Sequence, residues 1–241
     1  MWGDRVRLAS RRITDLWHAN SALLTAVLVI GGLLVVFAFI AEEVLEGEPF
    51  AFDRSVLLAL RSPANPSEPI GPVWLQEAAR DLTALGSFTV LGIVVVTVVG
   101  YLFLAGKRAA AWLVLVAVVG GVILNTLLKL GFARPRPEFA SATRVFTPSF
   151  PSGHAALSAV AYLTLGALLA QLHRATRIRI YFLATGVILT LLVGLSRIYL
   201  GVHYPTDVIA GWCIGSAWAW ACWALMTRLQ QRGQVEPPDR T

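Results

Sequence analysis

Long apolar runs alternate with short polar segments along this chain. Each run holds close to 20 residues, which at 1.5 Å per residue reach across the roughly 30 Å hydrocarbon core of a bilayer. The pattern predicts an all-α, polytopic bundle of six transmembrane helices, at about 21–41, 84–104, 109–130, 153–171, 180–197 and 205–226. We expect residues 1–241 to form a single integral membrane domain.

The longest polar segment, residues 42–83, separates the first two predicted spans and is rich in Asp and Glu. Within it, residues 52–61 and 74–85 show apolar positions at helical spacing, and several prolines separate the two stretches. We therefore expect two short amphipathic helices that lie at the membrane surface. The polar tail, 227–241, is expected to lie outside the membrane.

The composition agrees with a membrane protein. Hydrophobic residues make up 56% of the chain and charged residues only 14%, against about 25% charged in a soluble domain. The net charge of +6 does not indicate a nucleic-acid partner, because the basic residues are scattered between apolar runs. The two cysteines, Cys213 and Cys222, lie nine residues apart on one predicted helix, too far apart for a disulfide.

The charges are distributed unequally between the two faces of the predicted bundle. An even number of spans places both termini on one face, and that face holds 12 of the 20 Lys and Arg residues but only 4 of the 14 Asp and Glu residues. The opposite face holds 8 basic and 10 acidic residues. By the positive-inside rule, the face with both termini is cytoplasmic.

The last predicted span carries two further patterns. Gly211 and Gly215 form a Gly-x-x-x-Gly motif, which predicts close contact with another helix. Trp218, Trp220 and Trp223 lie towards the end of this span and indicate an aromatic belt at the membrane interface.

Three polar clusters lie at the ends of predicted spans, all on the face opposite the termini. Lys129 ends one run, His154 begins the next, Arg197 ends a third and Asp207 begins the last. A single Lys or Arg at such a position can extend towards the lipid headgroups without any further role. Because these cations lie at the same depth as His154 and His203, the group as a whole indicates a functional site.

The segment Pro151-Ser152-Gly153-His154 is typical of a helix start, with serine as the cap. The exposed backbone amides of such a terminus bind anions, and Gly153 has no side chain to obstruct them. A capped helix without a ligand would show the same first three residues. His154 adds a titratable group beside the predicted anion site.

His203 and Asp207 are four residues apart and can share one helical face. A carboxylate that accepts a hydrogen bond from one imidazole nitrogen leaves the other nitrogen available as a nucleophile or base. The alternative is a structural histidine at the membrane interface. The remaining histidines, His18 and His173, fall on the cytoplasmic side beside basic residues, so we expect them to contact solvent or headgroups.

Together, the three clusters resemble the signature of the type-2 phosphatidic acid phosphatase superfamily, including its bacterial phosphatidylglycerophosphate phosphatase and undecaprenyl-diphosphate phosphatase types. The matching positions are, in order, Lys129, Arg136-Pro137, Pro151-Ser152-Gly153-His154, Ser196-Arg197, His203 and Asp207. The six-residue gap after Lys129 selects Arg136 as the family arginine. Arg134, in the doubled Arg-Pro pair, is therefore an additional cation.

The resemblance implies a role for each matching residue. His203 would attack phosphorus and form a phosphohistidine, Asp207 would orient His203, and His154 would protonate the leaving oxygen and then activate water. The phosphate-binding residues would be Lys129, Arg136, Ser152, Gly153 and Arg197, with Arg134 and Ser196 as auxiliary residues. The family requires no metal or other cofactor.

The implied function is a lipid phosphatase of the bacterial inner membrane, with its active site on the extracytoplasmic face. Candidate substrates are phosphatidylglycerophosphate, phosphatidic acid and undecaprenyl diphosphate, because the signature contacts phosphate and not the lipid. A phosphotransferase with a lipid acceptor and a non-catalytic lipid-phosphate binder or transporter are the alternatives. Vanadium haloperoxidases share the anion cradle, but they are larger soluble proteins. The expected partners are a lipid phosphate and the bilayer, and no nucleic acid.

Overall fold

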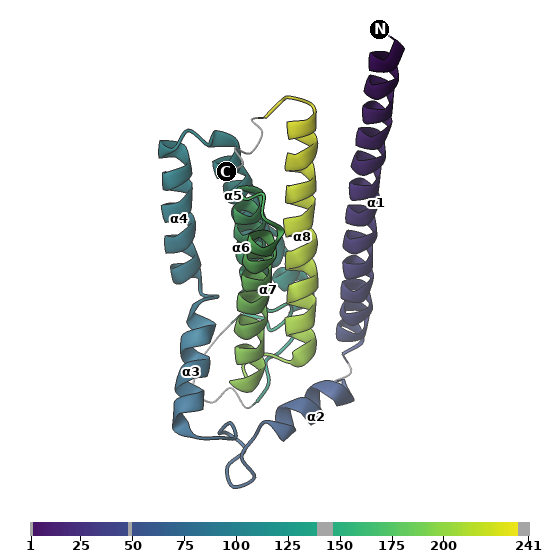
Figure 1. Ribbon diagram of the computed structural model, residues 1–241. Helices are drawn as coiled ribbons and strands as arrows, with labels where there is room; N and C mark the ends of the chain where they lie inside the picture. Colours follow the sequence, from purple (N-terminus) through teal and green to yellow (C-terminus); the bar gives the residue numbers. More distant parts are fainter. Residues whose placement is uncertain (1, 48–49, 139–146, 236–241) are drawn as a thin grey trace.

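The structure, a computed structural model, describes residues 2–47, 50–138 and 147–235, with side chains from residue 24 onward. Within these ranges the regular elements are helices: α1 (Trp2–Glu46), α2 (Ala51–Ala59), α3 (Val73–Ala84), α4 (Phe88–Leu104), α5 (Arg108–Phe132), α6 (Gly153–Gln171), α7 (Thr176–Tyr199) and α8 (Pro205–Gln231). Figure 1 shows α4 to α8 as a bundle, with α1 along α8 and with α2 and α3 at one end. The predicted all-α architecture is confirmed.

Five segments are long and apolar enough to cross a bilayer: Leu24–Glu46, Arg108–Phe132, Gly153–Gln171, Thr176–Tyr199 and Pro205–Gln231. Helices α3 and α4 meet at a bend of 46° and together form a sixth candidate. Five of the six predicted spans correspond to these segments, and the predicted span 84–104 corresponds to α4 of the bent pair.

Two helix ends differ from the predicted span boundaries. Helix α1 continues past residue 41 to Glu46 and keeps Val44 buried against the loop before α6. The chain bends after residue 84, and α4 begins at Phe88. Ser87 caps α4 by accepting a hydrogen bond from Val90 N at 3.2 Å, which explains the new start.

Helices α2 and α3 occupy the two stretches in which short helices were predicted. Their position at a membrane surface stays a prediction. The start of α1 and the end of α8 lie at the end of the bundle opposite α2 and α3 (Figure 1). The side chain of His18 and the arginines of the N-terminal arm lie outside the described side chains.

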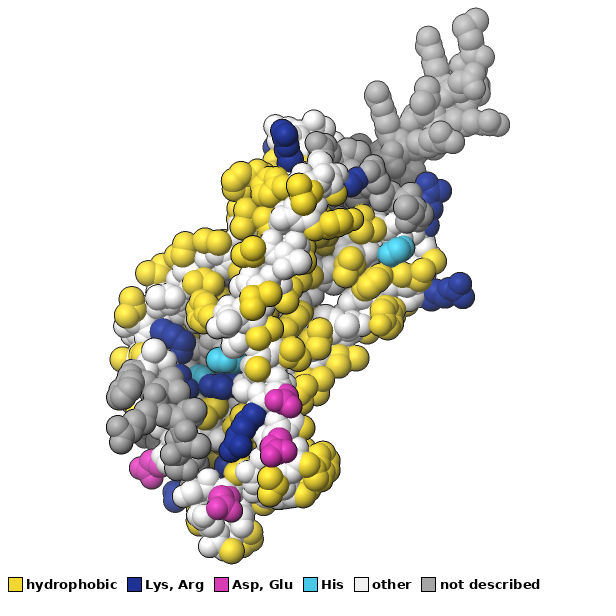
Figure 2. Space-filling view, turned by 90° about the vertical axis from the view of Figure 1, so that its left-hand side faces the viewer, with side chains coloured by type: hydrophobic (Ala, Val, Ile, Leu, Met, Phe, Trp, Pro, Cys, Tyr) yellow, Lys and Arg dark blue, Asp and Glu magenta, His cyan; other side chains and the backbone are white. Residues whose placement is uncertain are grey.

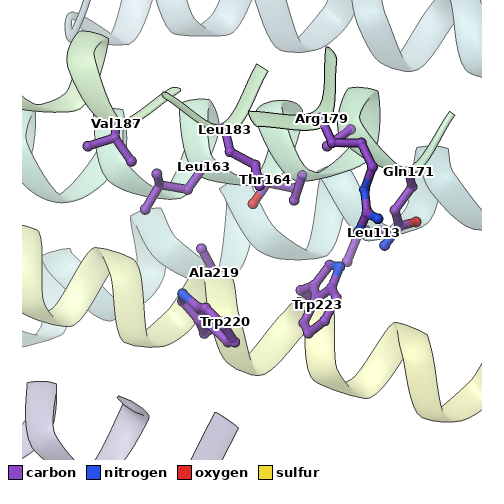
Figure 3. A pocket seen from close by; sticks show the side chains of 12 residues that line it. Leu113, Leu163, Thr164, Gln171, Arg179, Leu183, Val187, Ala219, Trp220 and Trp223 are labelled. Atoms are coloured by element: carbon purple, nitrogen blue, oxygen red, sulfur yellow. The ribbon is translucent and has the colours of Figure 1, made fainter. Parts of the chain in front are cut away.

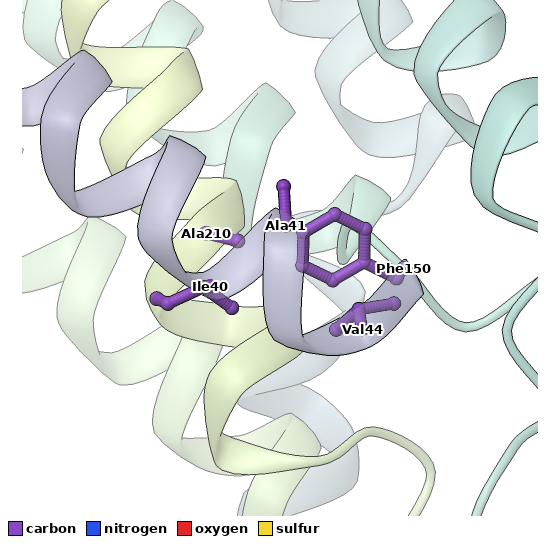
Figure 4. Close-up of a cluster of buried hydrophobic side chains, with 5 residues drawn as sticks. All are labelled: Ile40, Ala41, Val44, Phe150 and Ala210. Carbon is purple, nitrogen blue, oxygen red and sulfur yellow. The ribbon is translucent and has the colours of Figure 1, made fainter. Parts of the chain in front are cut away.

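Helix α1 packs against α8 and against the loop that leads into α6. Ile40, Ala41 and Val44 of α1 form a buried cluster with Ala210 of α8 and Phe150 of the loop (Figure 4). Phe150 is completely buried and stacks on Phe37 with ring centroids 5.7 Å apart. This apolar contact fixes the loop immediately before Pro151 and Ser152.

Helices α6 and α8 approach each other closely at the Gly-x-x-x-Gly motif. A Cβ atom on Gly211 would lie 2.7 Å from the Ser152 carbonyl oxygen, and one on Gly215 would lie 2.4 Å from that of Ala156. Both distances are too short for any side chain, so the predicted close contact is confirmed. It brings the second and third turns of α8 against the start of α6.

Replacement of Gly215 by alanine is expected to destabilise the protein by about 1–3 kcal/mol, the usual cost of overpacking, because α6 and α8 must separate. The thermal unfolding midpoint in detergent measures this effect. Gly92→Ala on α4 is the matched control, since no atom lies within 4 Å of a Cβ at that position. Equal midpoints for the two variants would contradict the packing described here.

Candidate active site

The predicted site residues come from helix ends that meet at one end of the bundle. Lys129 lies in the last turn of α5, His154 in the first turn of α6, Arg197 in the last turn of α7 and Asp207 in the first turn of α8. The alternating direction of consecutive helices brings these four ends together. The structure therefore gathers residues that are up to 78 positions apart.

His203 lies in the loop between α7 and α8 and is almost completely buried. Its Nδ1 atom is 3.4 Å from Asp207 Oδ2, and its Nε2 atom is 3.1 Å from Arg136 Nη1. Burial lowers the pKa of His203 to about 4, although the hydrogen bond and negative charge of Asp207 act in the opposite direction. The imidazole is therefore neutral at pH 7, with Nδ1–H donating to Asp207 and the Nε2 lone pair facing Arg136.

The carboxylate of Asp207 is held from several directions. Oδ2 accepts hydrogen bonds from Tyr204 N, at 2.9 Å, and from the Ser149 hydroxyl group. Oδ1 accepts a hydrogen bond from Arg134 Nη1 at 2.6 Å. Because every contact is a charge-assisted or buried hydrogen bond, Asp207 has one well-defined orientation towards His203.

The two arginines of the Arg-Pro-Arg-Pro segment reach opposite sides of the His203–Asp207 pair. Arg134 contacts Asp207 and Asp53, whereas Arg136 donates to Val202 O at 2.8 Å and Thr147 O at 3.0 Å and faces His203.

The guanidinium group of Arg134 is thus bound between two carboxylates. Burial lowers its pKa, but the charges and hydrogen bonds of Asp207 and Asp53 outweigh burial and raise the pKa above its ordinary value. An auxiliary phosphate-binding role was predicted for Arg134. This placement instead supports a role in holding Asp207.

The other two cations also reach the site. Lys129 Nζ donates to Pro148 O at 2.6 Å, and Arg197 Nη1 donates to Thr83 Oγ1 of α3 at 3.1 Å. Arg197 Nε is buried without a hydrogen-bond partner among the described residues. Lys129, Arg136 and Arg197 lie within electrostatic range of one another, so they form one region of positive potential.

The turn before α6 connects directly to α8. Ser152 N donates to the Asp207 carbonyl oxygen at 2.9 Å, and the Ser152 hydroxyl group is buried without a partner in the part of the chain that the structure describes. A Cβ atom on Gly153 would lie 3.2 Å from Asn125 Nδ2 and 3.6 Å from Lys129 Cε. Gly153 therefore permits close approach of Lys129 to the first turn of α6.

His154 packs against the bend between α3 and α4, where a Cβ atom on Gly86 would lie 3.4 Å from His154 Cβ. It is within electrostatic range of His203, Arg197, Arg136 and Lys129. Ser196, the second predicted auxiliary residue, donates its hydroxyl group to Val193 O at 2.7 Å within α7. The side chain of Ser196 therefore forms its hydrogen bond within α7.

Sequence reasoning missed several residues that support the site: Asp53, Thr83, Asn125, Ser149 and Thr206. They come from α2, α3, α5, the loop before α6 and α8, and none belongs to a motif. The sequence offered one signal for these residues. Arg134 is an additional arginine beside the motif, and a buried arginine requires a carboxylate partner.

Figure 2 shows one face of the molecule. Histidine side chains lie there beside Lys and Arg side chains, near the end where the visible acidic side chains gather.

A separate cavity of about 390 Å³ lies between α6, α7 and α8, and Leu163, Leu183, Trp220 and Trp223 are among the residues that line it (Figure 3). None of the predicted site residues lines this cavity.

Comparisons with known proteins agree with the family that the sequence motifs resemble. A family model described as the PAP2 superfamily matches residues 110–231, a range that contains every predicted site residue. Phosphatidylglycerophosphatase B of Bacillus subtilis is 33% identical over 148 residues, which are 59% of this chain and 70% of that protein. Undecaprenyl-diphosphatase of Sulfolobus acidocaldarius is 34% identical over 127 residues, or 50% of this chain and 57% of the relative.

Among solved structures, the crystal structure of a transmembrane PAP2-type phosphatidylglycerolphosphate phosphatase from Bacillus subtilis superposes with a TM-score of 0.71. The match covers 83% of this chain and 96% of that chain, at 25% identity. The match therefore extends beyond residues 110–231.

Proposed function

Since this chain belongs to the PAP2 superfamily, we propose that it is a metal-independent lipid phosphatase of the bacterial inner membrane. It hydrolyses the terminal phosphate monoester or diphosphate of a lipid. Its substrate is one of the lipids that the matched relatives and the signature suggest: phosphatidylglycerophosphate, phosphatidic acid or undecaprenyl diphosphate. The whole chain acts as one domain, which the packing of α1 on α8 and of α3 on α7 supports.

The arrangement of His203 carries this proposal. Asp207 accepts from Nδ1, so Nε2 carries the lone pair, which accepts a hydrogen bond from Arg136 Nη1 at 3.1 Å. A neutral imidazole beside a phosphate-binding cation is a nucleophile aimed at phosphorus. Arg136 shifts aside as the phosphate enters and then binds a phosphoryl oxygen.

The reaction proceeds in two displacements. Nε2 of His203 attacks phosphorus, the P–N bond forms as the P–O bond to the lipid breaks, and His154 gives a proton to the departing oxygen. His154, now neutral, takes a proton from water, whose oxygen attacks phosphorus. The P–N bond then breaks, its electron pair returns to Nε2, and inorganic phosphate leaves. Asp207 holds the Nδ1 proton and stabilises the positive charge on His203 throughout.

Fixed positive charge stabilises the transition state. Phosphoryl transfer depends mainly on in-line positioning and on charge around the equatorial oxygens. Lys129, Arg136 and Arg197 supply this charge, and the Ser152 hydroxyl group and the Gly153 amide donate further hydrogen bonds. Three cations around one phosphate replace the divalent metal that other phosphoryl-transfer enzymes use.

The active site opens on the extracytoplasmic face, and both termini are cytoplasmic. Support comes from the excess of Lys and Arg at the end of the bundle opposite the site. Helices α2 and α3 then lie on the outer side, at the membrane surface. A lipid phosphate of the outer leaflet can approach the site without crossing the membrane.

Phosphate release by the purified protein in detergent, with EDTA present, tests the function. We expect at least one of phosphatidylglycerophosphate, phosphatidic acid and undecaprenyl diphosphate to yield inorganic phosphate, and His203→Ala to release about 10⁴-fold less or lower still. Restoration of activity only by added Mg²⁺ would contradict the metal-free mechanism. A phosphorylated acceptor lipid in place of inorganic phosphate would identify a phosphotransferase, and retention of substrate without any product would indicate a binder.

A further inference from the structure

Asp53 is a buried carboxylate that neither the family signature nor the reaction described above includes. It lies in the first turn of α2, and its side chain is almost completely buried. A buried carboxylate is costly unless hydrogen bonds and an opposite charge satisfy it. The hydrogen-bond partners of Asp53 therefore indicate the role of this part of α2.

Both oxygens of Asp53 are directed at residues that support His203. Oδ1 accepts a hydrogen bond from Thr206 N at 2.9 Å. Oδ2 accepts one from the Thr206 hydroxyl group at 2.5 Å and one from Arg134 Nη2 at 2.9 Å. Arg134 in turn donates from Nη1 to Asp207 Oδ1 at 2.6 Å and to Thr206 Oγ1 at 2.9 Å. A continuous chain of contacts runs from Asp53 through Arg134 and Asp207 to His203.

We propose that Asp53 is a positioning residue for phosphoryl transfer, acting through Arg134 and Thr206 on the Asp207–His203 pair. The inference rests on the proposed function. Asp53 fixes the guanidinium group of Arg134 so that Nη1 holds one oxygen of Asp207, while the other oxygen stays directed at Nδ1 of His203. Helix α2 thereby becomes part of the catalytic apparatus.

Two features make His203 sensitive to this support. The Nδ1 to Oδ2 distance is already 3.4 Å, so a small rotation of the Asp207 carboxylate breaks that hydrogen bond. Thr206 N is one of the amides at the start of α8 that have no partner within the helix, and Asp53 supplies its acceptor. Loss of Asp53 frees Arg134 and the first turn of α8 together.

The charge of Asp53 contributes as well as its shape. Arg134 lies between two carboxylates and balances both. Without Asp53, its full charge acts on Asp207, which then attracts the Nδ1 proton less strongly and stabilises positive charge on His203 less well. The phosphate-binding cations Lys129 and Arg197 have other partners, Pro148 and Thr83, so they are unaffected.

The test compares Asp53→Asn with Asp81→Asn, in full-length protein purified in detergent. Asp81 is an exposed aspartate on α3, in the same polar segment, and serves as the matched control. Asparagine keeps an acceptor for Thr206 N but removes the charge that holds Arg134. We expect kcat to fall by about 10²-fold, as for a small misplacement of a reacting group. KM and the inhibition constant of vanadate should stay within about threefold of wild type, because the cations remain in place.

A second variant covers the case in which Asp53→Asn folds poorly. Thr206→Val keeps the volume of the side chain but removes the hydroxyl group shared by Asp53 and Arg134, and we expect a smaller loss of kcat with unchanged KM. The number of sites that bind vanadate is measured by titration, and kcat is calculated per such site, so that it refers to folded protein only. A merely structural role would lower the number of sites but not kcat per site.

The outcomes separate the inference from the function on which it rests. Absence of phosphate release by wild-type protein would contradict the proposed function. Release by wild type, with wild-type kcat per site in both Asp53→Asn and Thr206→Val, would overturn the positioning role. A raised KM with unchanged kcat would also overturn it, since Asp53 would then act on substrate binding.

Discussion

Replacement of His203 by alanine is expected to reduce phosphate release by about 10⁴-fold or more, the scale on which loss of a covalent nucleophile acts. Among the residues that the structure describes, the other groups that contact Asp207 Oδ2 are the Ser149 hydroxyl group and Tyr204 N, and both already donate to this carboxylate. The measurement is release of inorganic phosphate from phosphatidylglycerophosphate in detergent, over times long enough to detect single turnovers.

His173→Ala is the matched control for this substitution. His173 follows α6 at the other end of the bundle and stacks on Phe182, with ring centroids 5.5 Å apart. We expect its loss to leave kcat within about twofold of wild type, as is usual for a residue that does not contact the reacting atoms. Residual activity of His203→Ala above about 1% of wild type would show that another group is the nucleophile.

Replacement of His154 by alanine is expected to lower release from phosphatidylglycerophosphate by about 10²–10⁴-fold, the usual contribution of a general acid–base. An alkoxide leaving group requires a proton, and His154 is a histidine within electrostatic range of His203. Both displacements slow, because His154 protonates the leaving oxygen in the first and activates water in the second.

A substrate with a different leaving group separates the two steps. p-Nitrophenolate leaves as a stable anion, so the first displacement from p-nitrophenyl phosphate needs no acid. We expect His154→Ala to release one equivalent of nitrophenol per site in a burst and then to turn over slowly, since the phosphohistidine persists. A steady-state rate equal to that of wild type would exclude His154 from the second step.

Much of the fold could be predicted from the sequence, because hydropathy and motif spacing are local properties. The predicted span at 153–171 coincides with α6, and the helices expected at 52–61 and 74–85 appear within two residues as α2 and α3. The meeting of Lys129, His154, Arg197 and Asp207 at one end of the bundle followed from span direction alone. Those features need no knowledge of how helices pack.

Features that depend on packing could not be predicted. Asp53 lies 81 positions before Arg134 in the sequence, and no local pattern distinguishes it from the exposed acidic residues around it. The bend at Gly86 is set by close contact with Val193 of α7 and with His154 of α6, so it is visible only once three helices are in place.

The packing of one aromatic residue could not be predicted from its position either. The place of Trp218 in an interfacial belt stays a prediction. Its indole packs over Gly120 and Gly121 and donates from Nε1 to Ala117 O at 2.8 Å. It therefore joins α8 to α5. Small residues on α5 made this contact possible, and that signal lies about 100 positions from the tryptophan.

The most direct test of the proposed mechanism is to trap the phosphorylated enzyme. Wild-type protein and His154→Ala are mixed with phosphate-labelled p-nitrophenyl phosphate, from which the first displacement needs no acid, and are then quenched in alkali and digested. The proposed mechanism predicts acid-labile, alkali-stable label on the peptide that contains His203, with more label in His154→Ala than in wild type. Release of labelled phosphate without any labelled His203, or label on another residue, would contradict it.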